Sequence, residues 1–178
     1  SVSATTRSPR EGEQEAVQYF FKSDEEFDAL VNEDGLLEWA TYADHRYGTP
    51  KSAVLGHIAQ GEQVVLEIDV QGCLQAMKQN PDATGVFICP PSRENLEKRL
   101  RNRGTETEES IRVRLGNVAG EVSQAYKYDY VIIHQDWADV PNALDVAADE
   151  LYAIITARRL EKDNRVEFLD QLSASLRK

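Results

Sequence analysis

The chain has 178 residues, which is long enough for one hydrophobic core with a small inserted arm. Its 41% of hydrophobic residues excludes a disordered protein, and its formal net charge of −11 at pH 7 argues against nonspecific binding of nucleic acid or anionic membranes. No apolar run is long enough to span a bilayer, and no secretory signal is recognisable. Cys73 and Cys89 stand in apolar runs without metal-ligand spacing, which is typical of free thiols in a reducing cytoplasm. We therefore expect a cytoplasmic globular protein.

Residues from about 7 to 47 are rich in short strands and predict a small antiparallel arm. A capping box of Ser23 and Glu26 opens a helix in this region, and Gly35 ends it. Alternating and aromatic runs predict strands at 1–6, 18–21 and 35–42, and Gly48 and Pro50 indicate a turn and strand end at 45–50.

The rest of the chain alternates strands with helices. Short apolar runs predict buried strands at 63–69, 85–89 and 128–133. Apolar stripes predict helices at 51–60, 70–79, after Ser92, at 111–122 and 144–155, and a charged helical tail at 158–178. This alternation indicates a three-layer α/β fold with a parallel sheet. Because ligands bind at the carboxyl ends of such strands, we expect Asp69 and the loops after Cys89 and Ile133 to line one crevice.

Two arginines follow the opening strand. Pro9 fixes its own φ and keeps Ser8 out of a helix, so Arg7 and Arg10 project from a short, stiff loop. Guanidinium forks in such a loop suit a doubly charged phosphate, because each fork can donate two parallel hydrogen bonds. Two solvated loop arginines are the alternative interpretation of these residues alone.

A lone acid in an apolar run indicates purine recognition. Glu38 lies within LLEWA, where a half-buried carboxylate needs partners. The N1–H and amino group of guanine are a matched pair of donors, so Glu38 could read guanine and reject adenine, while the Ser3 and Thr49 hydroxyls serve its O6 side. The phenols of Tyr19 and Tyr47 could donate to phosphate oxygens. Alternatively, Glu38 pairs with a lysine or arginine, and the tyrosines are ordinary strand-end aromatics.

Arginines also gather around a polar loop in the second half of the chain. Transferring phosphoryl groups need such positive charge, and a mobile loop could deliver it on closure. For two of them, Arg101 and Arg112, we favour solvated pairs with glutamates on the same helix face. The others are Arg99, Arg103 and Arg114.

The ordered motifs together resemble the guanylate kinase family over residues 1 to about 157. These are SVSATTRSPREGE, EFDALVNEDGLLEWA, YGTP, VVLEIDVQG, FICPPS, RLRNRGTETEESIRVRL and YDYVII. The resemblance implies a three-layer, parallel-sheet nucleoside-monophosphate kinase (P-loop kinase) fold. It implies a core of 1–3, 48–97 and 111–178, an inserted GMP-binding arm of 4–47, and a lid of 98–110.

The resemblance also implies roles for individual residues. Arg7, Arg10, Tyr19 and Tyr47 match positions that hold the substrate phosphate, and Ser3, Glu38 and Thr49 match those that read guanine. Asp69 matches an acidic position beside the nucleotide, and Glu13 an arm residue expected to orient an arginine. Arg99, Arg103 and Arg114 match the catalytic arginines that stabilise the transferred phosphate. ATP with Mg²⁺ is the implied donor, and no metal site made of protein ligands is expected.

Several positions depart from the family pattern. No G-x-x-x-x-G-K-[ST] loop occurs in the sequence, so we expect an N-terminal βα segment of roughly 25 to 30 residues in the working protein. We expect this chain by itself to be incomplete for ATP binding. A slot filled by another chain and a degraded remnant are the alternatives. His134 stands where the family has an asparagine near the adenosine, either as a cofactor-binding residue or as a strand-end histidine that bonds locally. Ala16 replaces a glycine, and Asp44 and His45 replace a Gly-Asn pair.

Two functions from different classes follow. The first is a guanylate kinase that transfers the γ-phosphate of ATP to GMP to give GDP and ADP. The second is a catalytically inactive, guanylate kinase-like module that binds GMP or a phosphorylated partner. GMP and ATP are the expected partners, with a homo-oligomer as a further possibility, and the acidic balance argues against RNA binding.

Overall fold

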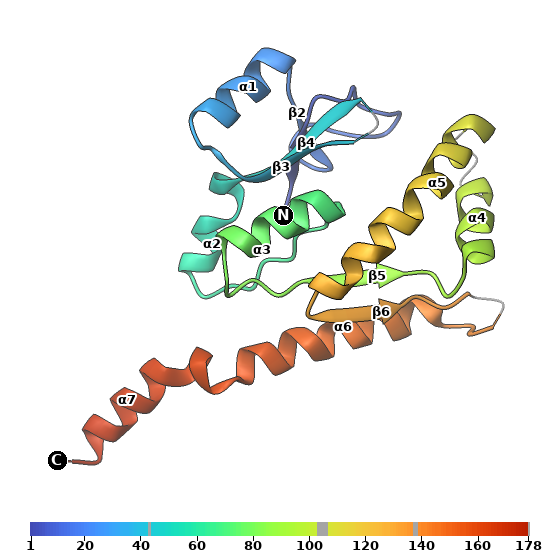
Figure 1. Cartoon of the computed structure of the whole chain (residues 1–178). Helices are drawn as coiled ribbons and strands as arrows, with labels where there is room; N and C mark the ends of the chain where they lie inside the picture. The colour runs from blue at the N-terminus through green and yellow to red at the C-terminus, as the bar shows by residue number, and fades with distance from the viewer. Residues whose placement is uncertain (43, 103–106, 137–138, 178) are drawn as a thin grey trace. The chain divides into compact units, whose positions relative to one another are not determined.

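The computed structural model describes residues 1–42, 44–102, 107–136 and 139–177 (Figure 1). The chain divides into two compact units, Ser1–Gly85 and Val86–Lys178, and each is described by itself. This division does not test the expected boundaries of core, arm and lid, which stay a prediction. Among the described residues, no helix is both long and apolar enough to cross a membrane.

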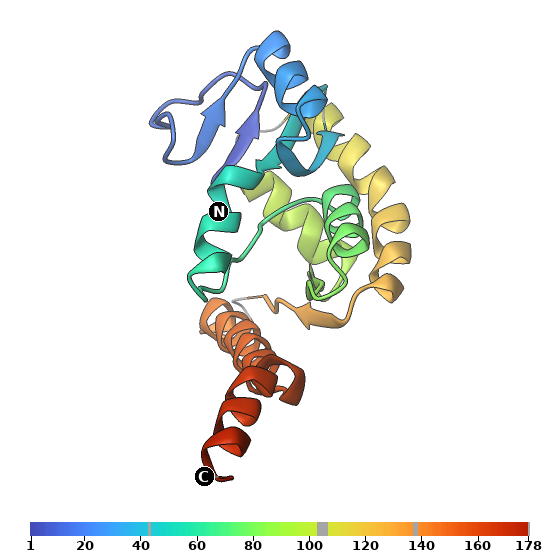
Figure 2. The same cartoon turned by 90° about the vertical axis from the view of Figure 1, so that its left-hand side faces the viewer.

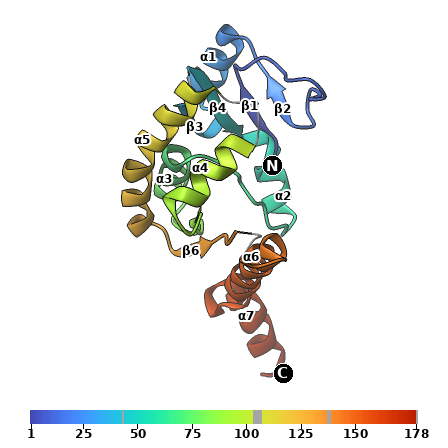
Figure 3. The same ribbon diagram turned by 90° about the vertical axis from the view of Figure 1, so that its right-hand side faces the viewer.

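A four-stranded sheet forms the centre of the first unit. Its strands lie in the order β2-β1-β4-β3, where β1 is Ser3–Thr5, β2 Tyr19–Phe21, β3 Leu36–Tyr42 and β4 His45–Pro50 (Figure 3). Three of them, β1, β2 and β3, confirm the predicted strands, and the stretch predicted as a turn and strand end is the full strand β4. The expectation of a purely antiparallel arm is wrong, because β1 and β2 pair in parallel. The loop between them, which carries Arg7 and Arg10, is the long crossover that a parallel pair requires.

Helix α1, Asp24–Asn32, packs on this sheet. Its capping box is present: the Ser23 hydroxyl accepts from the Glu26 amide at 3.2 Å, and the Glu26 carboxylate accepts from the Ser23 amide at 2.7 Å. Phe27 is fully buried against Ala4 and Leu36 in the core of the unit. The helix therefore holds β1 and β3 in place, and these strands carry candidate site residues.

The strand predicted at 63–69 does not form. Residues 63–69 have no ladder partner among the described residues and lead directly into α3, Val70–Gln79. The Ser1 amine donates to the Val65 carbonyl in this stretch at 2.9 Å, which is a single hydrogen bond and not a ladder. An apolar run becomes a strand only where a neighbour offers a row of backbone partners.

The helix predicted at 51–60 is broken into two turns. The 3₁₀ helix η1 is Lys51–Ala53 and α2 is Leu55–Ala59, with Val54 between them at φ −124°. Gly61 follows at φ +78°, a left-handed conformation that suits glycine.

The second unit contains a parallel pair of strands. β5, Val86–Cys89, pairs with β6, Tyr130–Ile133, in a register that sets Cys89 opposite Ile133. The loops after these two strands therefore leave from the same edge, as expected. Asp69 belongs to the first unit, so its place in a common crevice stays a prediction.

Helices follow both strands of this pair. After β5 come α4, Arg93–Asn102, and α5, Glu108–Gln124, which the Thr107 hydroxyl caps; η2, Ala125–Lys127, leads to β6. After β6 come α6, Ala143–Leu160, the 3₁₀ turn η3, Lys162–Arg165, and α7, Val166–Ser175 (Figure 2). All four α-helices confirm the predicted helices.

Candidate functional site

A buried carboxylate lies on the edge strand β3 of the first unit's sheet. Glu38 on β3 is only 4% exposed, and the fully buried Thr49 on β4 donates its hydroxyl to Glu38 Oε1 at 2.7 Å. The register of β3 and β4 shifts between Leu36 and Trp39. Such an irregularity re-aims side chains, and here Leu36, Leu37 and Glu38 are all buried in succession. The bulge thus turns an acid inward among apolar neighbours.

The surroundings of Glu38 make its charge costly. Burial raises the pKa of Glu38, the Thr49 hydrogen bond opposes this rise, and the negative charge of Asp69 adds to it. Among the described residues no lysine or arginine forms an ion pair with Glu38, which excludes the alternative interpretation of this acid. A buried carboxylate kept beside a hydroxyl and without a cation is suited to accept hydrogen bonds from a ligand.

Asp69 begins the helix next to this carboxylate. Its Oδ1 accepts from the Gly72 amide at 2.8 Å, so Asp69 is the N-cap of α3. The cap fixes the first turn of α3 beside β3. The structure therefore brings Glu38, Thr49 and Asp69 together from three separate stretches of the sequence.

Arg7 is held in a second cluster of the same unit. Its guanidinium donates to both carboxylate oxygens of Glu13, at 3.0 and 2.9 Å, and lies 5.3 Å from the centre of the Tyr19 ring. The Tyr19 ring meets Tyr47 edge-on at 6.0 Å between centroids. Glu13 also accepts from the Arg10 amide at 2.7 Å. The expectation that Glu13 orients an arginine is confirmed, and that arginine is Arg7.

The ion pair between Arg7 and Glu13 shifts the pKa of both residues. The Arg7 hydrogen bond, helped by the Arg10 amide, lowers the pKa of Glu13. Glu13 in turn raises the pKa of Arg7, with a smaller contribution from Tyr47. Both groups are therefore fully charged near neutral pH, and Arg7 is positioned for an anion.

Two further candidate residues of the first unit are Ser3 and Arg10. Ser3 on β1 is registered opposite Tyr19 on β2, and Arg10 is exposed in the crossover loop. Thr5, fully buried, was missed: its hydroxyl accepts from the Arg7 amide at 3.1 Å and donates to the Arg46 carbonyl at 3.0 Å. The alternation in SVSATT could have shown that Thr5 faces inward, but its partner Arg46 lies 41 residues away in the chain.

In the second unit the structure joins two candidate residues. Arg99 on α4 donates to the carbonyls of His134 and Gln135, at 2.9 and 2.7 Å, and its Nη1 lies 3.2 Å from His134 Nδ1. The His134 amide donates to the Cys89 carbonyl at 2.8 Å. His134 thus bonds locally, as the alternative interpretation expected, and its role with a cofactor stays a prediction. Arg114 lies on α5, partly buried, and Arg103 lies outside the described residues.

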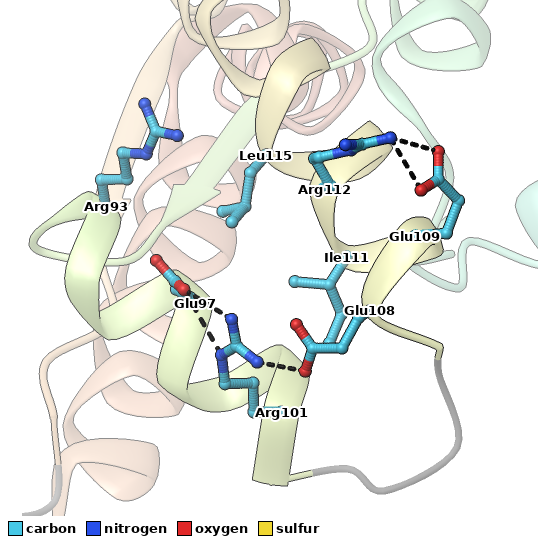
Figure 4. A pocket seen from close by; sticks show the side chains of 8 residues that line it. All are labelled: Arg93, Glu97, Arg101, Glu108, Glu109, Ile111, Arg112 and Leu115. Atoms are coloured by element: carbon cyan, nitrogen blue, oxygen red, sulfur yellow. Dashed lines mark hydrogen bonds and ion pairs between the residues drawn. The ribbon is translucent and has the colours of Figure 1, made fainter.

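A pocket of about 340 Å³ lies between α4 and α5 (Figure 4). Two of its three arginines are paired with glutamates: Arg101 contacts Glu97 at 2.9 Å and also Glu108, and Arg112 contacts Glu109 at 2.7 Å. The prediction of solvated ion pairs for Arg101 and Arg112 is confirmed. The pocket is lined by Arg93, Glu97, Arg101, Glu108, Glu109, Ile111, Arg112 and Leu115.

Comparison with solved structures identifies the class of protein from its fold. The crystal structure of guanylate kinase from Anaplasma phagocytophilum matches with a TM-score of 0.75 and 31% sequence identity, covering 91% of this chain and 76% of that one. The fold is therefore that of the nucleoside-monophosphate kinases, as predicted.

Sequence comparison narrows the class to a family. The family model described as guanylate kinase matches residues 1–151. The guanylate kinase of Caldanaerobacter subterraneus subsp. tengcongensis is 45% identical over 163 residues, covering 92% of this chain and 76% of that protein. That of Halalkalibacterium halodurans is 41% identical over 172 residues, covering 97% and 81%. The chain belongs to the guanylate kinase family.

Proposed function

We propose that the chain binds GMP and, as a guanylate kinase, transfers the γ-phosphate of ATP to it to give GDP and ADP. The observation that carries the proposal is the buried Glu38–Thr49 pair in the same sheet as the Arg7–Glu13 cluster. The carboxylate supplies acceptors for the two donors on the guanine edge, and the fixed guanidinium supplies donors for the phosphate. The relatives compared are named guanylate kinases, and they give no support to an inactive module.

Separate groups of candidate residues bind the base, bind the monophosphate and stabilise the transferred phosphoryl group. Glu38 and Thr49 read the base with Ser3 and Asp69 beside them, and Arg7, Arg10, Tyr19 and Tyr47 hold the monophosphate. Arg99, Arg103 and Arg114 stabilise the transferred phosphoryl group, and His134 lies at the adenosine end. Transfer is in line, with no covalent intermediate, so these residues act by positioning and by charge.

Mg²⁺ is proposed to arrive with ATP. Among the described residues, no group of three or more histidines, cysteines or acids could hold a metal ion. Mg²⁺ commonly binds through substrate phosphates and water rather than in an all-protein cage. When bound, the ion neutralises charge on the phosphate oxygens.

Calorimetry with GMP and AMP tests the proposed function directly. We expect GMP to bind at least about 10²-fold more tightly than AMP, because a site built for N–H donors rejects the analogue that lacks them. Equal affinities would overturn the proposal. A GMP preference without formation of GDP from ATP and Mg²⁺, in a protein that also carries the expected phosphate loop, would instead support the binding module.

Arginine replacements test the charge-stabilising step. Arg99→Ala is expected to lower kcat about 10²- to 10³-fold, since a guanidinium beside a transferring phosphoryl group contributes at least that much. Arg101→Ala is the matched control on the same helix: its partners are the exposed Glu97 and Glu108, so kcat should change less than about twofold. A coupled assay at saturating GMP measures both variants. Equal losses in the two would contradict the role given to Arg99.

A further inference from the structure

The first turn of α3 approaches the Glu38 carboxylate unusually closely. A Cβ placed on Gly72 would lie 2.3 Å from Glu38 Oε2 and 3.1 Å from Glu38 Cδ. Real Cβ atoms essentially never approach another heavy atom to under 3.0 Å. The carboxylate therefore occupies space that any other residue at position 72 would fill.

The backbone at Gly72 does not itself require glycine. Gly72 lies inside α3 and its φ is outside the left-handed region. In a helix interior, alanine is the more favourable residue. Helix formation alone would thus favour alanine here, and the reason for glycine is the neighbouring carboxylate.

We propose that Gly72 is a positioning residue for Glu38: its missing Cβ lets the carboxylate lie against the first turn of α3, and this placement sets the preference for GMP over AMP. The inference rests on the proposed function, because it assumes that Glu38 reads the base. It adds a specificity-determining position that does not have to touch the nucleotide.

An alanine at position 72 would act on Glu38 and leave the rest of the site in place. The same Cβ would lie 3.6 Å from Asp69 Oδ1, an ordinary contact, so the N-cap of α3 survives. The Glu38 carboxylate is the far end of a side chain and gives way more easily than backbone. It must move by about 1 Å to restore normal contact, which also disturbs the 2.7 Å bond from Thr49.

Calorimetry on the full chain with GMP and AMP tests this proposal. Gly72→Ala should weaken the affinity for GMP at least about tenfold, because a displacement of about 1 Å in a binding group can lower affinity or rate by up to about 10²-fold. AMP lacks the N1–H that Glu38 accepts, so its affinity should change less than about twofold. The melting temperature should change little, because the gain in helix propensity offsets the cost of moving the Glu38 side chain.

Two further variants separate positioning from a general structural role. Gly56→Ala in α2 is the matched control, because a Cβ added at Gly56 would meet no atom of the described residues within 4 Å. In a Glu38→Ala background, Gly72→Ala should have no further effect on GMP affinity, because the displaced group is gone.

The outcomes distinguish a failure of the role given to Gly72 from a failure of the proposed function. Loss of GMP affinity alone, absent in the Glu38→Ala background, supports the proposal. Unchanged GMP affinity in Gly72→Ala, or equal weakening of GMP and AMP, overturns it while leaving the proposed function intact. If the unchanged protein shows no preference for GMP, the proposed function fails first and this inference fails with it.

Discussion

Replacing Glu38 with glutamine is expected to remove most of the preference for GMP. Glutamine keeps the size and shape of the side chain, but it presents one amide donor where the carboxylate presents only acceptors. Guanine N1–H and its amino group would then face a donor in a buried site, where an unmatched hydrogen bond is costly. We expect the dissociation constant for GMP to rise about 10²-fold, with AMP changed less than about threefold.

The same variant should be more heat-stable near neutral pH. Burial raises the pKa of Glu38 above its value in the unfolded chain, so the folded state resists losing this proton. At a pH below the pKa of the unfolded chain, Glu38 is neutral in both states and does not lower the free energy of unfolding. As the pH rises through the unfolded pKa toward the folded one, ionisation destabilises the fold, and glutamine avoids this cost. The melting temperature of Glu38→Gln should exceed that of the unchanged protein at about pH 7.5 and approach it near about pH 4.

Glu33→Gln is the control for this pair of measurements. Glu33 is an exposed acid at the end of α1 in the same unit. It should alter neither GMP affinity nor the pH dependence of melting. If Glu38→Gln retained GMP affinity, or melted lower at neutral pH than the unchanged protein, the account of a strained, ligand-reading carboxylate would be wrong.

Local patterns predicted most of the elements because each carries its own signal. The capping box of Ser23 and Glu26 fixes the start of α1 without help from the rest of the fold, and the Asp69 cap does the same for α3. The run at 63–69 failed because apolar residues alone do not make a strand: pairing depends on neighbours that are far away in the sequence. The bulge beside Glu38 is invisible to strict alternation for the same reason.

Residue types indicated the candidate site, but they did not indicate the contacts that connect its residues. A lone acid within LLEWA indicated Glu38, but only the structure shows Thr49 as its partner and Gly72 as its neighbour. Likewise Arg99 and His134 were assigned separate roles, although 35 residues of chain fold back to bring them into contact. Such contacts depend on how strands and helices pack, and no local pattern encodes them.

Replacing Arg7 with alanine is the second change with a large expected effect. Arg7 is largely buried, with 11% of its side chain exposed. Its guanidinium is fixed by the ion pair with Glu13 and by its contact with the Tyr19 ring. A fork held in this way binds phosphate without first losing side-chain freedom. Loss of a bidentate, charge-assisted contact should raise the KM for GMP about 10²-fold or more. Guanosine, which has no phosphate, should bind the variant and the unchanged protein equally, and the exposed Arg112 offers a control in Arg112→Ala.

Glu13→Gln separates the orientation of Arg7 from its charge. Arg7 keeps its guanidinium in this variant but loses a charged anchor that holds it at two points. The affinity for GMP should therefore weaken by about tenfold, which is less than in Arg7→Ala.

The pH dependence of melting tests the Arg7–Glu13 ion pair independently. Because Arg7 lowers the pKa of Glu13, the ion pair stabilises the fold above the unfolded pKa of glutamate, and this stabilisation is lost as the pH falls through the folded value. The unchanged protein should therefore lose melting temperature below about pH 4.5 more steeply than Glu13→Gln. Parallel acid profiles, together with full GMP affinity in Glu13→Gln, would show that Arg7 needs no anchor and that the phosphate is held elsewhere.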